Sequence, residues 1–230
     1  MIHRIALLVV LLPLLAAALL LAGCKRQHHE VGLKLPDQAP GQMIGVIDDT
    51  SGSFRKHQTK VYAFLLRLLD AYGKNSSPGD RLVISQLSGG GRSILWEGHP
   101  RLLRRDFPSA AAFEQFIVTA PGSDPDYSRV YQSFCEMTDY ILACPGIESG
   151  KSKGAVFLLS DCIENAADSD QWKARLERSL AKFGEKKGII GIYWCDPDVR
   201  ADMRRLLNGA GIKNIVETDV LTRPELPMWK

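Results

Sequence analysis

The chain has 230 residues, enough for one domain of ordinary size, and 45% of them are hydrophobic, which is ample for a buried core. Its formal net charge at pH 7 is only +3. The basic residues occur as scattered pairs at expected helix ends and loops, so the charge pattern argues against nucleic-acid binding and favours an ordinary solvated surface.

The first 23 residues have the pattern of a secretory signal peptide. Arg4 gives a basic start, residues 5–21 form an apolar run that only Pro13 interrupts, and small residues precede Cys24. A retained transmembrane helix is the alternative, and the run is near the lower limit of about 17–25 residues for a membrane span.

The ending Leu21-Ala22-Gly23-Cys24 resembles the lipobox of bacterial lipoproteins. The resemblance implies that the signal is removed before Cys24, that Cys24 receives a diacylglyceryl group, and that the new amino terminus is acylated with a fatty acid such as palmitate. In Gram-negative lipoproteins a residue other than Asp after the Cys usually permits transfer to the outer membrane, and here that residue is Lys25. We therefore expect a lipid anchor in the cell envelope, on the periplasmic side of the outer membrane if the source is Gram-negative.

Residues 24–41 are expected to comprise the lipidated Cys and a flexible tether. The segment is polar at first, then contains Pro36, Pro40 and Gly41, and shows no hydrophobic periodicity. His28 and His29 lie in this tether, where a solvated pair of side chains is a simpler explanation than a metal site.

From residue 42 to residue 220, short apolar runs alternate with segments of helical periodicity. The expected strands are 43–48, 81–87, 93–97, 155–160, 188–194 and 214–216. The expected helices are 54–72, 109–119, 128–142, 170–184 and 198–208. This alternation predicts an α/β fold, a doubly wound and mostly parallel sheet with helices on both faces. Residues 221–230 are expected to form a C-terminal tail.

Oxygen-bearing side chains follow two of the expected strands. Asp49, Ser51 and Ser53 form an Asp-x-Ser-x-Ser turn after the first strand, Asp161 follows the strand 155–160, and Ser128 begins a helix. In doubly wound sheets, ligands bind at the carboxyl ends of strands that send their helices to opposite faces. Carboxylates and hydroxyls together suit a hard divalent cation such as Mg²⁺.

Three segments resemble the von Willebrand factor type A (vWA) domain, and the match covers about residues 42–220. They are Val46-Ile47-Asp48-Asp49-Thr50-Ser51-Gly52-Ser53-Phe54, Tyr127-Ser128-Arg129-Val130-Tyr131-Gln132-Ser133-Phe134 and Leu158-Leu159-Ser160-Asp161-Cys162-Ile163-Glu164-Asn165. In that family they correspond to the first strand with its metal-ion-dependent adhesion site (MIDAS), to a Gly-Thr-x-Leu-x-x-Ala-Leu segment and to a Leu-Thr-Asp-Gly-x-x-Asn segment. The resemblance implies a Rossmann-like fold. It assigns Asp49, Ser51, Ser53, Ser128 and Asp161 as ligands of Mg²⁺ or Mn²⁺.

Two positions depart from the family pattern. Ser128 stands where Thr is usual, which keeps the hydroxyl. Cys162 stands where Gly is usual after the second Asp, and this change can alter the loop or supply a thiol for a disulfide.

In the vWA family one coordination position of the metal stays open, so the resemblance implies that an Asp or Glu of a partner protein completes it. We therefore expect a non-enzymatic, metal-dependent protein-binding module whose partner the sequence does not name. One alternative is a structural envelope lipoprotein with a vestigial metal site. Another is a magnesium-dependent hydrolase, although no His, Lys or Cys falls at a position that points clearly to a base or nucleophile beside the metal.

Four cysteines besides Cys24 would face an oxidising space, where disulfides persist. In the vWA family the strands before Cys162 and Cys195 are neighbours, so the resemblance implies that these two thiols lie at one sheet edge within reach of a bridge. Two buried free thiols are the alternative. Cys135 and Cys144 can pair only if their helix ends between them, because a continuous helix would separate them by about 13 Å.

Overall fold

The computed structural model describes residues 41–52, 54–72, 77–87, 94–120, 128–217 and 226. The expected signal peptide, Cys24, the tether up to residue 40 and Ser53 lie outside the described residues, as does most of the expected tail. None of the helices in the described part is long and apolar enough to cross a membrane.

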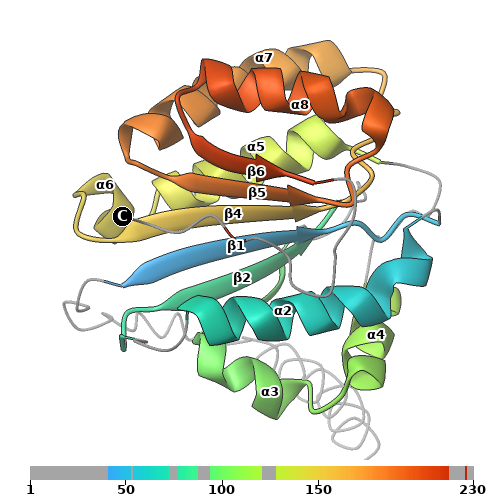
Figure 1. Ribbon diagram of the computed structural model, residues 1–230. Helices are drawn as coiled ribbons and strands as arrows, with labels where there is room; N and C mark the ends of the chain where they lie inside the picture. The colour runs from blue at the N-terminus through green and yellow to red at the C-terminus, as the bar shows by residue number, and fades with distance from the viewer. Residues whose placement is uncertain are drawn as a thin grey trace, which may run out of the picture. The chain divides into compact units, whose positions relative to one another are not determined.

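A six-stranded sheet forms the centre of the domain, with the strand order β3-β2-β1-β4-β5-β6 (Figure 1). The strands are β1 (Gln42–Asp48), β2 (Arg81–Gln86), β3 (Ile94–Gly98), β4 (Lys153–Leu159), β5 (Ile189–Tyr193) and β6 (Lys213–Val216). All neighbouring pairs are parallel except β2 and β3, which are antiparallel. The predicted α/β fold with a mostly parallel sheet is therefore confirmed.

Helices connect the strands. They are α2 (Gln58–Tyr72), α3 (Leu103–Asp106), α4 (Ala110–Val118), α5 (Val130–Leu142), α6 (Pro145–Glu148), α7 (Ser169–Glu185) and α8 (Pro197–Gly209), with 3-10 turns η1 (Arg55–His57) and η2 (Pro100–Leu102). The expected helices were found within a few residues, except that the first turn after residue 54 is 3-10 rather than α-helical. The short helices α3 and α6 were not predicted, because four residues are too few to show a helical period.

The sheet has an apolar core on each face, as a doubly wound fold requires. Alternate residues of β1 point to opposite faces: Ile44 and Val46 pack with α2, α3 and α4, whereas Met43 and Ile47 pack with α5, α7 and α8. Gly45 allows α5 to lie close to β1, since a Cβ at this position would come within 2.5 Å of the Met137 sulfur. This close contact holds the carboxyl-terminal half of α5 against the middle of β1.

A candidate metal-binding site at the switch point of the sheet

The centre of the sheet contains the switch point that the sequence predicted. From β1 the chain passes through α2 to β2, and from β4 it passes through α7 to β5 on the opposite face, while β1 and β4 lie side by side (Figure 1). A crevice at the carboxyl ends of such strands is where doubly wound folds bind their ligands. The Asp49 amide donates to the Leu159 carbonyl at 3.1 Å, which holds the turn after β1 against the end of β4.

Asp49 is a fully buried carboxylate at this edge, with no exposed surface. Its Oδ1 accepts a hydrogen bond from the Ser51 amide at 2.9 Å, and its Oδ2 accepts one from the Ser160 hydroxyl at 2.7 Å. Burial raises the pKa of the Asp49 carboxyl above its ordinary value, the hydrogen bonds from Ser51 and Ser160 oppose this shift, and the nearby charge of Asp161 adds to it. A divalent cation placed between a buried carboxylate and a second carboxylate nearby would relieve the repulsion of their charges.

Asp161 lies at the carboxyl end of β4 and is half-buried. Its Oδ1 accepts a hydrogen bond from the Ile163 amide at 3.0 Å, and its backbone carbonyl accepts one from the Asp196 amide at 2.9 Å. The side chain is thus held by its own turn and the backbone by the turn after β5. Asp49 and Asp161, which are far apart in the sequence, therefore lie near one another at the predicted edge.

Ser128 is brought to the same edge by the loop that follows Asp161. The Ser128 amide donates to Asn165 Oδ1 at 2.7 Å, and the Asn165 amide donates to the Ser128 carbonyl at 3.3 Å. One residue earlier in that loop, Glu164 accepts the Tyr131 amide through Oε2 at 2.9 Å and the Ala166 amide through Oε1 at 2.9 Å. Glu164 thereby places a carboxylate at the amino-terminal end of α5, where the helix dipole stabilises negative charge.

Sequence reasoning did not find the positioning roles of Glu164 and Asn165. The only signal was that both residues fall in the segment 158–165, which resembles part of the vWA domain. Their partners lie 33 and 37 residues earlier in the chain, so the contacts exist only once β1, β4 and α5 have assembled.

Asn165→Ala is expected to weaken Mg²⁺ binding about 10-fold, the lower end of the effect of removing groups that orient metal ligands. The change leaves the Ser128 amide without its side-chain acceptor, so the free energy of unfolding should also fall by about 1–3 kcal/mol. Calorimetric Mg²⁺ titration and urea denaturation measure the two effects. Asn208→Ala, on α8, removes an exposed amide contact with Asn214 of β6 and should leave Mg²⁺ affinity unchanged. Equal affinities for both variants would contradict the positioning role.

The departure from the family pattern at Cys162 has a clear conformational consequence. Cys162 has a φ of 65°, in the left-handed region that glycine adopts without strain and other residues rarely occupy. Its amide donates to the Ser160 hydroxyl at 2.9 Å, and that hydroxyl donates to Asp49. The thiol is buried, and its contact with Cys195, its burial and the charges of Asp161 and Asp49 all raise the pKa of the Cys162 thiol.

All four cysteines of the described residues are free thiols in the structure. Helix α5 is continuous from Val130 to Leu142, so Cys135 within it and Cys144 just after it do not meet. Cys162 and Cys195 do come near each other, since their interaction raises the pKa of the Cys162 thiol and lowers that of the Cys195 thiol, and the bridge between them stays a prediction.

The donor chemistry of the assembled residues fits a hard cation. Ser51 and Ser128 are 5% and 7% exposed, and with Asp49 and Asp161 they offer only oxygen atoms at one sheet edge. The remaining predicted ligand, Ser53, is outside the described residues. Across the described ranges no group of three or more His, Cys, Asp or Glu side chains is placed to hold a metal, so the candidate depends on two carboxylates supplemented by hydroxyls.

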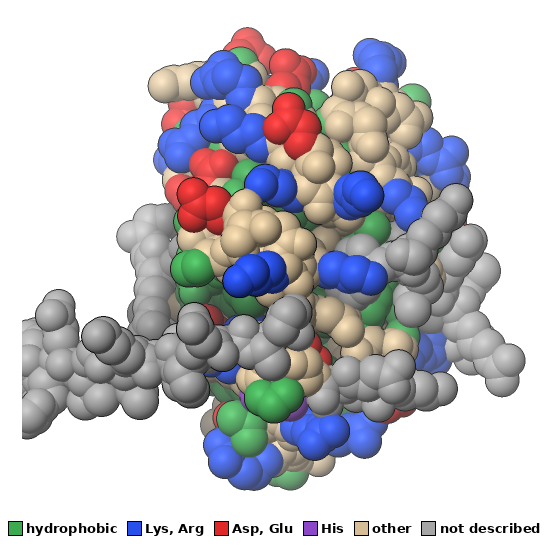
Figure 2. Space-filling model, turned by 90° about the vertical axis from the view of Figure 1, so that its left-hand side faces the viewer, with side chains coloured by type: hydrophobic (Ala, Val, Ile, Leu, Met, Phe, Trp, Pro, Cys, Tyr) green, Lys and Arg blue, Asp and Glu red, His purple; other side chains and the backbone are tan. Residues whose placement is uncertain are grey.

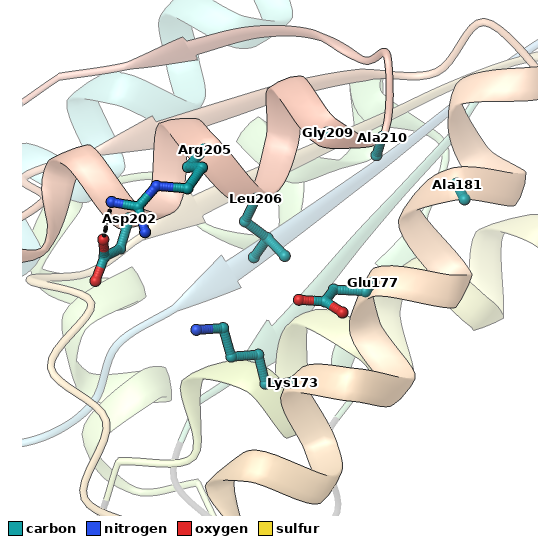
Figure 3. Close-up of a pocket in the computed structure, with 8 residues that line it drawn as sticks. All are labelled: Lys173, Glu177, Ala181, Asp202, Arg205, Leu206, Gly209 and Ala210. Atoms are coloured by element: carbon teal, nitrogen blue, oxygen red, sulfur yellow. Dashed lines mark ion pairs between the residues drawn. The ribbon is translucent and has the colours of Figure 1, made fainter.

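A cavity of about 410 Å³ lies between α7 and α8, away from this edge (Figure 3). Its wall carries Lys173 and Glu177 from α7 and an ion pair between Arg205 and Asp202 of α8 at 2.8 Å. Leu206 supplies an apolar part of the wall. None of the predicted ligands lines this cavity, and its mixture of opposite charges points to no particular ligand.

Comparisons with known proteins give structural likeness only. No protein-family model matches the chain, and no curated protein matches it. Among solved structures, the chain is similar to the N-terminal domain of TFIIH p34, with a TM-score of 0.44 and 10% identity over 78% of this chain and 92% of that one. It is also similar to the pilus adhesin SpaC from Lactobacillus rhamnosus GG in an open conformation, with a TM-score of 0.48 and 11% identity. That match covers 80% of this chain but only 28% of the adhesin, and at these values neither likeness carries an argument about function.

Proposed function

We propose that this protein is a lipid-anchored vWA-type domain that binds a partner protein through a divalent metal ion. Asp49, Ser51, Ser53, Ser128 and Asp161 would hold the ion, Mg²⁺ or Mn²⁺, and a carboxylate of the partner would complete its coordination. The observation that carries the proposal is the arrangement of Asp49 beside Asp161, with one carboxylate fully buried, both held by hydrogen bonds, and both at the switch point of the sheet.

The ligand charges favour recognition of an acidic partner. When bound, the metal would supply positive charge at a place where the protein provides two carboxylates and otherwise neutral hydroxyls. Mg²⁺ takes octahedral oxygen coordination and commonly keeps several waters, so a partner's Asp or Glu can replace one of them. Hydrogen bonds from the Ser51 amide and the Ser160 hydroxyl fix the orientation of the Asp49 carboxylate and restrict its motion. We propose a binding rather than an enzymatic role, because the sequence places no His, Lys or Cys at a position that points clearly to a base or nucleophile beside the metal.

Metal-dependent capture of the partner tests the binding role. The protein, immobilised through its C-terminus, is expected to retain a specific envelope protein in Mg²⁺, to release it in EDTA and to recover it when Mg²⁺ is restored. Asp161→Ala should lose the partner, whereas Asp202→Ala, which breaks an exposed ion pair with Arg205 on α8, should retain it. Capture that persists in EDTA would favour a structural lipoprotein with a vestigial site.

One face of the domain carries many exposed basic side chains. Strand β1 begins on the face at the amino ends of the parallel strands, where many Lys and Arg side chains are exposed (Figure 2). Lys151 and Lys153 beside β4 and Lys186 and Lys187 before β5 are exposed there. Such a surface would be attracted to anionic lipid headgroups when the domain comes near the membrane.

Replacement of Cys24 tests the anchor itself. Cys24→Ala is expected to move the protein from the membrane fraction to the soluble fraction and to abolish incorporation of labelled palmitate, since the acyl chains would have no attachment site. Cys144→Ala, which changes a half-buried thiol in the domain, should leave both unchanged. If the Cys24→Ala protein incorporates no labelled palmitate but stays in the membrane fraction, a retained transmembrane helix would be supported instead.

A further inference from the structure

The turns that follow β4 and β5 are joined by two backbone hydrogen bonds. The last residue pair in the register of these strands is Leu159 with Tyr193. Beyond it, the Ser160 amide donates to the Tyr193 carbonyl at 3.1 Å, and the Asp196 amide donates to the Asp161 carbonyl at 2.9 Å. The two turns therefore stay side by side past the end of the sheet.

Cys162 and Cys195 lie in these two turns, next to the residues that form the second bond. Their exposed fractions are 1% and 0%, and they belong to the same apolar core. The Cys162 thiol donates to the Ser160 carbonyl at 3.5 Å and the Cys195 thiol donates to the Asp196 carbonyl at 3.7 Å, so both thiols lie against the two joined turns. Neighbouring strands are about 4.8 Å apart, and a disulfide needs Cα atoms about 4.4–6.8 Å apart. The spacing of the two turns is thus of the size that a bridge requires.

We propose that Cys162 and Cys195 form a disulfide that holds the Asp161 turn in its ligand-presenting conformation. The thiol of one cysteine, as thiolate, attacks a disulfide oxidant, and the second thiolate then displaces the oxidant's remaining sulfur. The two cysteines lose two protons and two electrons, and the oxidant disulfide is reduced to two thiols. Because both sulfur atoms are buried, the exchange takes place while the turns are open, during folding or local unfolding.

The effect of this bridge on metal binding presupposes the metal site of the proposed function. Cys162 directly follows Asp161 and occupies a strained left-handed conformation, and its amide donates to the hydroxyl of Ser160 that orients Asp49. A bridge to Cys195 ties this turn covalently to the end of β5. Without the bridge, hydrogen bonds alone hold Cys162 in this conformation, so the turn should open more often and position Asp161 less firmly.

Disulfide mapping tests the bridge independently of the metal. The full-length protein, purified in detergent after folding with oxidised glutathione, is alkylated and digested without reduction. We expect one cross-linked pair of peptides containing Cys162 and Cys195, with Cys135 and Cys144 alkylated. A Cys135→Ser/Cys144→Ser double variant should give the same cross-link. Quantitative alkylation of Cys162 and Cys195 in this protein would overturn the inference.

Magnesium titration tests the coupling and separates the two proposals. Calorimetry should show Mg²⁺ affinity about 10-fold higher for the oxidised protein than for the protein reduced with dithiothreitol, with Cys195→Ala resembling the reduced form under both conditions. Equal affinity in both redox states would overturn the coupling and leave the proposed function standing. Absence of Mg²⁺ binding in both states would overturn the proposed function, and the mapping experiment would then decide the bridge alone.

Discussion

Asp49→Asn is expected to abolish the stabilisation of this protein by Mg²⁺. In the unchanged protein, Mg²⁺ at 100 times its dissociation constant should add about 2.7 kcal/mol to the free energy of unfolding. That gain raises the melting temperature by roughly 5–10 °C, at about 2–4 °C per kcal/mol for a domain of this size. An amide in place of the Asp49 carboxylate removes the charge that the cation needs, so the thermal shift with Mg²⁺ should fall to zero.

The same substitution is expected to leave the metal-free protein at least as stable as before. Because burial raises the pKa of Asp49, its ionised form costs folding free energy at pH 7, and this cost disappears as the pH falls through the raised pKa. Asn avoids the cost at every pH. Asn also fits the site. Its side-chain oxygen can accept the hydrogen bond from the Ser51 amide, and its NH₂ group can donate to the Ser160 hydroxyl once that hydroxyl rotates to act as an acceptor.

Thermal melts with Mg²⁺ and with EDTA measure both effects. Asp202→Asn changes an exposed carboxylate on α8 that pairs with Arg205, and it should keep the full Mg²⁺ shift. A normal Mg²⁺ shift in Asp49→Asn would remove Asp49 from the proposed site. Loss of folding by the metal-free variant would contradict the account of its hydrogen bonds.

Phe157→Ala is expected to be among the most destabilising single changes in the domain. Phe157 lies in the middle of β4 with no exposed surface. Its ring contacts those of Phe64 and Tyr72 on α2 and of Tyr193 on β5, with centroids 6.2, 5.8 and 6.5 Å away. Truncation leaves a cavity between the sheet and α2, so the free energy of unfolding should fall by about 3–5 kcal/mol.

Urea denaturation gives this value from the shift in midpoint at an unchanged slope. Val118→Ala is a matched control, because Val118 is 38% exposed at the end of α4 and its truncation should change the free energy of unfolding by less than about 0.5 kcal/mol. A loss below 1 kcal/mol for Phe157→Ala would mean that β4 and α2 do not pack as described.

The sequence by itself determined the fold class and the position of the candidate site. Apolar runs such as 155–160 show the two-sided burial of a central parallel strand, and helical periodicity is strong in segments such as 128–142. Since parallel strands end at one edge, the turn at Asp49 and the residue Asp161 could be expected to meet there without any knowledge of distances. The informative features of the sequence were local. They were the hydrophobic periodicity within a single helix or strand, or a polar residue directly after a strand.

Tertiary structure decided the contacts that shape the site. Glu164 and Asn165 fasten the Asp161 loop to the start of α5, Cys162 takes a left-handed conformation, and its thiol meets that of Cys195. None of these leaves a repeating pattern in the sequence, because each depends on two segments more than 30 residues apart and on the exact path of a turn. At Cys162 the left-handed backbone conformation is accompanied by a local hydrogen bond to the Ser160 hydroxyl and by the bond from the Asp196 amide to the Asp161 carbonyl. The second bond exists only when β4 and β5 lie side by side.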